Sequence, residues 1–234
     1  MKILQKGFNY SQDGPGNRLV YHTQGCNFRC KWCSNPESMA GTNSKDREMA
    51  PEEILDEAVR SRMMFFDNGG VTFTGGEPTL QFDELKKTLT LLHENGINTA
   101  IENNGSHPRL CELSPLIDFL IVDLKHYDPE EHKKWTGVRN DTTVENIMKL
   151  LKIRSQLHIR IPLINHVNTD SSGFIKLFEN TDKSRATFEV LKYHEFGKDK
   201  WTSPYEITDG FVSDELFNNF TAALKDSGFN IIKT

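Results

Sequence analysis

The sequence predicts an α/β fold in which strands alternate with helices. Short apolar or β-branched runs predict the strands, and a stretch with apolar residues at helical spacing follows most of them. Strands are predicted at 19–23, 71–74, 98–101, 119–122, 157–161, 187–191 and 230–232. Alternation of this kind, here over about six strand–helix units, is typical of parallel strands joined by right-handed crossovers.

The helices are predicted from their apolar faces. The first, 51–66, carries Ile54 and Ala58 on one face, and the second carries apolar residues from Phe82 to Leu92 and ends at Gly96. Further helices are predicted around Leu110 and at 144–151, 171–179 and 213–227.

The length of the chain limits the architecture. Its 234 residues are few for a complete eight-unit barrel, which typically needs about 250. We therefore expect a partial, open (β/α)6 barrel, with a doubly wound sheet as the alternative because helix periodicity does not separate the two. No linker, low-complexity tract or shift in composition marks a boundary. We expect a single domain over residues 1–234.

Charge and hydrophobicity exclude several classes of protein. The 28 Lys and Arg against 33 Asp and Glu give a net charge of −5, which argues against nucleic acid or an anionic membrane as the main partner. The sequence has neither a secretory apolar region at its start nor a run of about 20 apolar residues. We expect a cytoplasmic protein, in which cysteines serve as ligands or reactive thiols.

Three of the four cysteines form one motif. Cys26, Cys30 and Cys33 have the spacing C-x3-C-x2-C directly after a predicted strand. A four-iron cluster normally takes four cysteines, so three would leave one iron open to a substrate or cofactor. A zinc site and three structural thiols are the alternatives. Zinc usually takes a second closely spaced pair of ligands, and the remaining Cys111 is isolated.

Two motifs together resemble the radical S-adenosylmethionine (SAM) enzymes: the cysteine motif after the first strand and Gly75-Gly76-Glu77-Pro78 after the second. Over nearly the whole chain, the sequence resembles the glycyl-radical enzyme activating enzymes, the family of pyruvate formate-lyase activating enzyme. The matching segments are Asp13-Gly14-Pro15-Gly16-x-Arg18, Gly69-Gly70-Val71, Asn104-Gly105, Asp123-Leu124-Lys125, Gly137-Val138 and Tyr193-His194-Glu195-x-Gly197-Lys198-x-Lys200-Trp201. The resemblance implies the partial (β/α)6 barrel of the radical SAM type.

The resemblance also implies roles for the two signature motifs. Cys26, Cys30 and Cys33 would be the catalytic ligands of one 4Fe-4S cluster, and the amino and carboxylate groups of SAM would chelate the fourth iron. Gly75 and Gly76 would let the backbone approach SAM closely. Glu77 would accept a hydrogen bond from the amino group of SAM; the alternative is an ordinary carboxylate at a helix start.

Three further positions match SAM contacts of the family. These are Lys125, Arg160 and His194. A charged Arg160 within the apolar segment 158–164 needs a polar partner, and an internal salt bridge with Asp or Glu is the alternative. His194 could instead be a core histidine with its hydrogen bonds satisfied.

Three acidic residues have other implied roles. Glu102 and Asp123 follow consecutive predicted strands and match a site for a monovalent cation, Na⁺ or K⁺, beside SAM. At the first position this chain has Glu where pyruvate formate-lyase activating enzyme has Asp, and carboxylates without an ion are the alternative. Asp13, in a predicted turn, would contact the glycine loop of the partner protein.

The implied function is hydrogen abstraction from a specific glycine of a glycyl-radical enzyme, with SAM and one electron from a flavodoxin or ferredoxin. The interval 34–74 contains no cysteine, so the ferredoxin-like insertion of some activating enzymes is absent and one cluster is expected. The run Trp32 to Glu37 is closer to activating enzymes of other glycyl-radical enzymes. The alternatives are a radical SAM enzyme acting on a small molecule, as in carboxy-deazaguanine synthases, and a non-catalytic metal-binding or electron-transfer protein. No role follows for Cys111.

Overall fold

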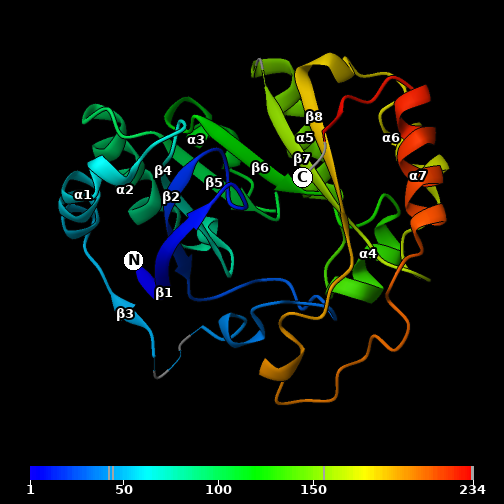
Figure 1. The fold of residues 1–234 in the computed structure, drawn as a ribbon, viewed down its shortest axis with the longest axis horizontal. Coiled ribbons are helices and arrows are strands. Elements are labelled where there is room, and N and C mark those ends of the chain that lie inside the picture. The colour runs from blue at the N-terminus through cyan, green and yellow to red at the C-terminus, as the bar shows by residue number, and fades with distance from the viewer. Residues whose placement is uncertain (42, 44, 155, 233–234) are drawn as a thin grey trace. The chain divides into compact units, whose positions relative to one another are not determined.

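A computed structural model describes residues 1–41, 43, 45–154 and 156–232 (Figure 1). The chain forms two compact units. The first contains residues 1–27, 37–103 and 109–121, and the second contains residues 28–36, 104–108 and 122–234. The strand β6 (Phe119–Asp123) runs from the first unit into the second.

The first unit is built on a mixed sheet with the strand order β3-β1-β2-β4-β5. These strands are β1 (Lys2–Tyr10), β2 (Asn17–Thr23), β3 (Arg47–Glu48), β4 (Gly70–Gly75) and β5 (Thr99–Asn103). The predicted parallel pairing of β2, β4 and β5 is confirmed. β1 is antiparallel to β2 and β3 and was not predicted. Most of its side chains are exposed, so its sequence lacks a continuous apolar run.

The helices of the first unit are α1 (Pro51–Arg60), α2 (Phe82–Glu94) and the short α3 (Leu110–Leu113). Helices α1 and α2 lie side by side in Figure 1 and pack against each other. The helix predicted at 51–66 ends earlier in the structure, at Arg60. After Arg60 the chain forms a 3₁₀ turn, and Asp67 and Asn68 then have positive φ angles of 55° and 63°, which reverse the chain toward β4.

The second unit contains a parallel sheet with the order β7-β8-β9. Its strands are β7 (Leu157–Leu163), β8 (Ala186–Lys192) and β9 (Ile231–Ile232). Its helices are α4 (Pro129–Thr136), α5 (Asp141–Ile153), α6 (Ser171–Leu177) and α7 (Asp214–Asp226). Helix α6 packs against α7, as Figure 1 shows. The predicted α/β class is confirmed, and a single domain over residues 1–234 stays a prediction.

Helix α4 was not predicted because its sequence, PEEHKKWT, has no apolar stripe. Its ends nevertheless carry recognisable signals. Asp128 caps the N-terminus by accepting hydrogen bonds from the Glu130 and Glu131 amides, and Gly137 follows the C-terminus with a φ of 83°. Within the described residues, no helix has the length and apolar character needed to cross a membrane.

A fully buried arginine, Arg18, joins the elements of the first unit. Its guanidinium donates to the Thr72 hydroxyl at 2.6 Å, to the Val71 carbonyl at 2.9 Å and to the Asn98 side-chain oxygen at 3.0 Å. It also donates to the carbonyl of Pro15 at 3.1 Å. Burial lowers the pKa of Arg18 to about 10, which leaves it charged at neutral pH. The arginine therefore ties the turn between β1 and β2 to β4 and to Asn98, the residue before β5.

We expect Arg18→Met to lower the free energy of unfolding by roughly 3 kcal/mol or more. Each buried acceptor that loses its donor costs about 1–3 kcal/mol, and this arginine serves several. Urea denaturation followed by circular dichroism measures the effect. Arg47→Met is the matched control, because its side chain is 66% exposed and its ion pair is worth about 1 kcal/mol or less. Equal effects of the two substitutions would contradict this account of Arg18.

Candidate active site

The three cysteines of the motif follow β2 in a loop without regular secondary structure. Cys30 is buried, and Cys26 and Cys33 are half-buried. No disulfide joins any of the four cysteines, all of which lie in the described part of the chain. Cys26 belongs to the first unit, and Cys30 and Cys33 belong to the second.

Helix α4 supports the loop around Cys30. The Arg29 amide donates to the Thr136 carbonyl at 2.7 Å, and the Lys31 amide donates to the Trp135 carbonyl at 3.1 Å. The last carbonyls of a helix have no partner within the helix, so they are available to another segment. Here they accept from the amides on both sides of Cys30. The end of α4 therefore fixes the backbone that carries this cysteine.

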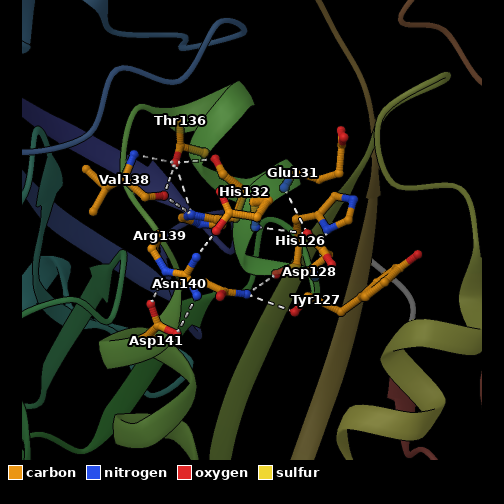
Figure 2. Close-up of polar contacts among 11 residues, drawn as sticks. His126, Tyr127, Asp128, Glu131, His132, Thr136, Val138, Arg139, Asn140 and Asp141 are labelled. Carbon is orange, nitrogen blue, oxygen red and sulfur yellow. Dashed lines mark hydrogen bonds and ion pairs between the residues drawn. The ribbon is translucent and has the colours of Figure 1, made fainter.

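Polar contacts hold α4 in place, as Figure 2 shows. The Asn140 side-chain amide donates to the carbonyls of His126 at 2.8 Å and Tyr127 at 3.0 Å, just before the helix. Inside the helix, His132 donates through Nδ1 to the Val138 carbonyl just beyond its end. Burial lowers the pKa of His132 to about 4, so its ring is neutral at pH 7. Its ring packs edge-on to Phe28, with centroids 5.3 Å apart.

The glycines of the second motif lie against the end of β2. A Cβ at Gly75 would lie 2.6 Å from the Cα of His22, and a Cβ at Gly76 would lie 2.2 Å from the Gly25 carbonyl oxygen. Gly75 also has a φ of 100°, a conformation that favours glycine. These positions therefore need glycine for backbone packing alone. Their predicted role in the approach of SAM stays a prediction.

Glu77 is fully buried at the start of the 3₁₀ helix Pro78–Gln81. Its amide donates to the Gly25 carbonyl at 2.7 Å, which links this motif to the residue before Cys26. Its carboxylate accepts from the Thr79 amide at 3.0 Å and from the Thr79 hydroxyl. The helix-start carboxylate weighed as the alternative is therefore present. A contact between Glu77 and SAM stays a prediction.

Two predicted site residues of the second unit form an ion pair. The Lys125 ammonium lies 2.8 Å from a carboxylate oxygen of Asp123, and both side chains are largely buried. Burial lowers the pKa of Lys125, but Asp123, Cys30 and Cys33 raise it, and the net effect is a raised pKa. Lys125 is therefore charged and electrostatically coupled to two of the motif cysteines.

Glu102 belongs to the first unit, where it accepts a hydrogen bond from the Thr74 hydroxyl at 3.3 Å. Asp123 belongs to the second unit and is paired with Lys125. A cation site formed by Glu102 and Asp123 stays a prediction.

Arg160 on β7 pairs with Glu189 on β8. The two residues are direct neighbours in the parallel register, and Nε of Arg160 donates to the carboxylate at 2.6 Å. Nε2 of His158 lies 3.0 Å from the same oxygen. The internal salt bridge weighed as the alternative for Arg160 is therefore present. A contact between Arg160 and SAM stays a prediction.

His194 and Asp13 also lie in ordered local contacts. The His194 ring stacks on Phe196 with centroids 4.2 Å apart, and burial lowers the pKa of His194. The Asp13 carboxylate accepts from the Asn9 side-chain amide at 2.5 Å, and its carbonyl accepts from the Thr72 hydroxyl at 2.8 Å. Asp13 lies in the turn between β1 and β2, as the glycines around it predicted. The binding roles of both residues stay predictions.

The comparison with known proteins identifies the family. Residues 20–177 match the family model of the radical SAM superfamily. The pyruvate formate-lyase-activating enzyme of Streptococcus mutans is 35% identical over 84% of this chain and 80% of its own length. That of Staphylococcus epidermidis is 33% identical over 83% of each chain. The chain belongs to the radical SAM superfamily and, within it, to the pyruvate formate-lyase-activating enzyme family.

Solved structures of radical SAM proteins share the fold. A domain of a pyruvate-formate lyase-activating enzyme from Bacteroides vulgatus has 27% identity and a TM-score of 0.59, over 70% of this chain and 98% of that one. A radical SAM methyltransferase from Sphaerobacter thermophilus, at 15% identity, has a TM-score of 0.69 over 96% of this chain and 67% of that one. The predictions of a radical SAM enzyme and of the partial-barrel fold class are confirmed.

The radical SAM family implies a 4Fe-4S cluster and SAM. The donors fit the cluster, because Cys26, Cys30 and Cys33 are thiols outside any disulfide and thiolates are the ligands of iron–sulfur clusters. In addition, the Asn35 amide donates to the Cys33 sulfur at 3.3 Å, and hydrogen bonds to the sulfurs are one factor that sets the reduction potential of such clusters. Among the described residues, no three His, Cys, Asp or Glu side chains are gathered as a site for a single metal ion.

The ion pair on β7 and β8 predicts a pH dependence of stability. Burial raises the pKa of Glu189, but the hydrogen bond from His158 and the charge of Arg160 lower it, to about 2. The pKa of Glu189 in the folded protein lies below its unfolded value of 4.5. The ionised Glu189 therefore stabilises the fold fully above pH 4.5, and this stabilisation is lost as the pH falls toward 2. The shift corresponds to about 3 kcal/mol.

We therefore expect Glu189→Gln to lower the free energy of unfolding by about 3 kcal/mol at pH 7. The variant should also lose less stability than the parent between pH 4.5 and 2. Urea denaturation across this range measures both effects, with the exposed Glu179→Gln as control. A parallel decline of parent and Glu189→Gln with pH would show that Glu189 does not carry this dependence.

Proposed function

We propose that the protein is a radical SAM activating enzyme that abstracts a hydrogen atom from the α-carbon of one glycine in a partner glycyl-radical enzyme. The observation that carries this proposal is the 32–35% identity to pyruvate formate-lyase-activating enzymes over most of the chain. The three-cysteine loop and the buried Glu77 beside Gly25 are consistent with it.

In this proposal Cys26, Cys30 and Cys33 would hold the cluster, which when bound would supply the electron for the reductive cleavage of SAM. The chain itself binds and orients. Glu77 accepts from the amino group of SAM, while Lys125 and Arg160 contribute positive charge.

Lys125 and Arg160 suit that task because each is already charged and held by a carboxylate, so little rearrangement is needed when an anionic group binds. His194 is the fourth contact to SAM. Its lowered pKa keeps the ring neutral at pH 7, so it can act as a hydrogen-bond donor or acceptor without added charge.

A glycine is a suitable target because no side chain blocks its α-carbon and its backbone is flexible enough for its loop to enter the site. Pyruvate formate-lyase is the first candidate partner, since the relatives are named for its activation.

Asp13 contacts the incoming glycine loop, and a flavodoxin or ferredoxin delivers the electron. The proposed site also includes a monovalent cation, Na⁺ or K⁺, bound by Glu102 and Asp123. The whole chain acts as one radical SAM domain.

The protein substrate can be identified by electron paramagnetic resonance. The protein is reconstituted anaerobically with iron and sulfide, reduced with dithionite, and mixed with SAM and pyruvate formate-lyase. We expect a glycyl-radical doublet that requires SAM and is absent when the target glycine is replaced by alanine. Turnover of a small molecule, without a doublet on pyruvate formate-lyase or any other glycyl-radical enzyme offered, would refute the activating role.

Two cysteine variants test the three-ligand site. We expect Cys30→Ala to abolish the formation of 5′-deoxyadenosine from SAM, because only two thiolates remain for the cluster. Cys111→Ala is the matched control, since Cys111 lies on α3 outside the motif, and it should retain the parent rate. Chromatography of the quenched reaction measures the product. Loss of activity in Cys111→Ala, or retention in Cys30→Ala, would contradict the assignment.

A further inference from the structure

The turn at residues 197–201 contacts the loop that carries Cys33. The indole N–H of Trp201 donates to the Cys33 carbonyl at 3.0 Å, although the two residues are 168 positions apart in the sequence. The Lys200 ammonium donates to the side-chain oxygen of Asn35 at 3.0 Å. Both contacts lie within the second unit. One turn therefore holds the residues on either side of Ser34.

Gly197 completes this contact through its backbone. A Cβ at Gly197 would lie 2.4 Å from both the Cα and the carbonyl oxygen of Ser34. Real Cβ atoms do not approach other atoms so closely, so any side chain here would displace Ser34. The 197–201 turn thus touches Cys33, Ser34 and Asn35 in succession.

The packed core of the second unit fixes the turn. The Tyr193 hydroxyl, just before it, shares a 2.8 Å hydrogen bond with the Tyr205 hydroxyl, just after it. Tyr193 is itself buried against Ile164 and Ile207. The Trp201 ring packs edge-on against Tyr205, with centroids 5.5 Å apart. The turn that supports the cysteine loop is therefore itself held by contacts with the core of the second unit.

The supported segment includes the hydrogen bond from the Asn35 amide to the Cys33 sulfur, at 3.3 Å. Hydrogen bonds to ligand sulfurs are among the factors that set the reduction potential of an iron–sulfur cluster, because they stabilise the more negative, reduced state. The direction of this N–H depends on the peptide that joins Ser34 to Asn35. Gly197 packs against the Ser34 carbonyl of that peptide, while Trp201 binds the Cys33 carbonyl before it and Lys200 binds the Asn35 side chain after it.

We propose that Gly197, Lys200 and Trp201 are positioning residues that aim the Asn35 amide at the Cys33 sulfur and thereby raise the reduction potential of the cluster. This inference rests on the proposed cluster at Cys26, Cys30 and Cys33. The segment 193–201 would then have two roles: His194 contacts SAM, and Gly197, Lys200 and Trp201 position the cysteine loop.

The test measures the cluster rather than the activity. Each variant is reconstituted anaerobically, and its midpoint potential and the g-values of its reduced cluster are determined by redox titration with electron paramagnetic resonance. Trp201→Phe keeps an aromatic ring but removes the donor. We expect a more negative potential, altered g-values and several-fold faster loss of iron to a chelator. Gly197→Ala should shift the potential further, because Ser34 must move.

Lysine variants separate positioning from simple charge. Lys200→Met should lower the potential, and Lys200→Arg, which retains a charged donor, should restore most of it. Lys198→Met is the matched control. It removes the same charge from the same turn, but Lys198 pairs with Glu195 at 2.7 Å. We expect a much smaller shift for Lys198→Met than for Lys200→Met.

The outcomes distinguish this inference from the proposed function. If the parent and variants bind a cluster and activate the partner, but Trp201→Phe and Gly197→Ala leave the potential and g-values unchanged, the positioning role is wrong and the activating role stands. Equal shifts in Lys198→Met and Lys200→Met would also overturn it, in favour of a charge effect. If the parent protein binds no cluster, both the inference and the proposed function fail.

Discussion

The arrangement of the candidate active site depends on how a short loop without regular secondary structure is held. Residues 28–35 form neither helix nor strand, so hydrogen bonds from other segments must fix their backbone. The end of α4 accepts from the amides on both sides of Cys30, and Trp201 donates to the carbonyl of Cys33. Two cysteines are thereby positioned by segments that lie far away in the sequence.

The same principle applies on the other side of the motif. The amides of Gly76 and Glu77 donate to the carbonyls of Thr23 at 3.0 Å and Gly25 at 2.7 Å. The first bond lies at the end of β2 and the second lies just beyond both strands, so the two bonds extend the parallel pairing of β2 with β4. Because a side chain at Gly76 would collide with the Gly25 carbonyl, the second signature motif and the residues that lead to Cys26 form one packed unit.

The sequence predicted the elements whose residues are continuously apolar. β4 and β7 are buried on both faces, and the apolar or β-branched runs at 71–74 and 157–161 predict them. β1 and α4 were missed because exposed or polar side chains dominate them. For α4, Asp128 before Pro129 and Gly137 after the last turn are capping signals that could have revealed the helix. The helix ends at Arg60, and the chain then reverses at Asp67 and Asn68. The spacing of the apolar residues predicts neither change.

For the site, sequence patterns suggest residue types and roles, but they do not suggest the contacts that hold these residues in place. The spacing of three cysteines indicated a cluster, and an internal salt bridge was the stated alternative for Arg160. The identity of its partner, Glu189, follows only from the register of β7 and β8. Support of the cysteine loop by α4 and by the 197–201 turn joins residues more than 100 positions apart, and local sequence patterns do not encode such pairings.

In the proposed site, three cysteines hold a four-iron cluster whose remaining iron binds SAM. The decisive experiment is electron–nuclear double resonance of the reduced, reconstituted protein, with SAM labelled at its amino nitrogen and carboxylate oxygen. We expect four irons per chain, bound as one cluster, and hyperfine coupling of both labels to that cluster. A cluster that forms fully but shows no coupling to either label, or a content that fits only a single metal ion, would contradict it.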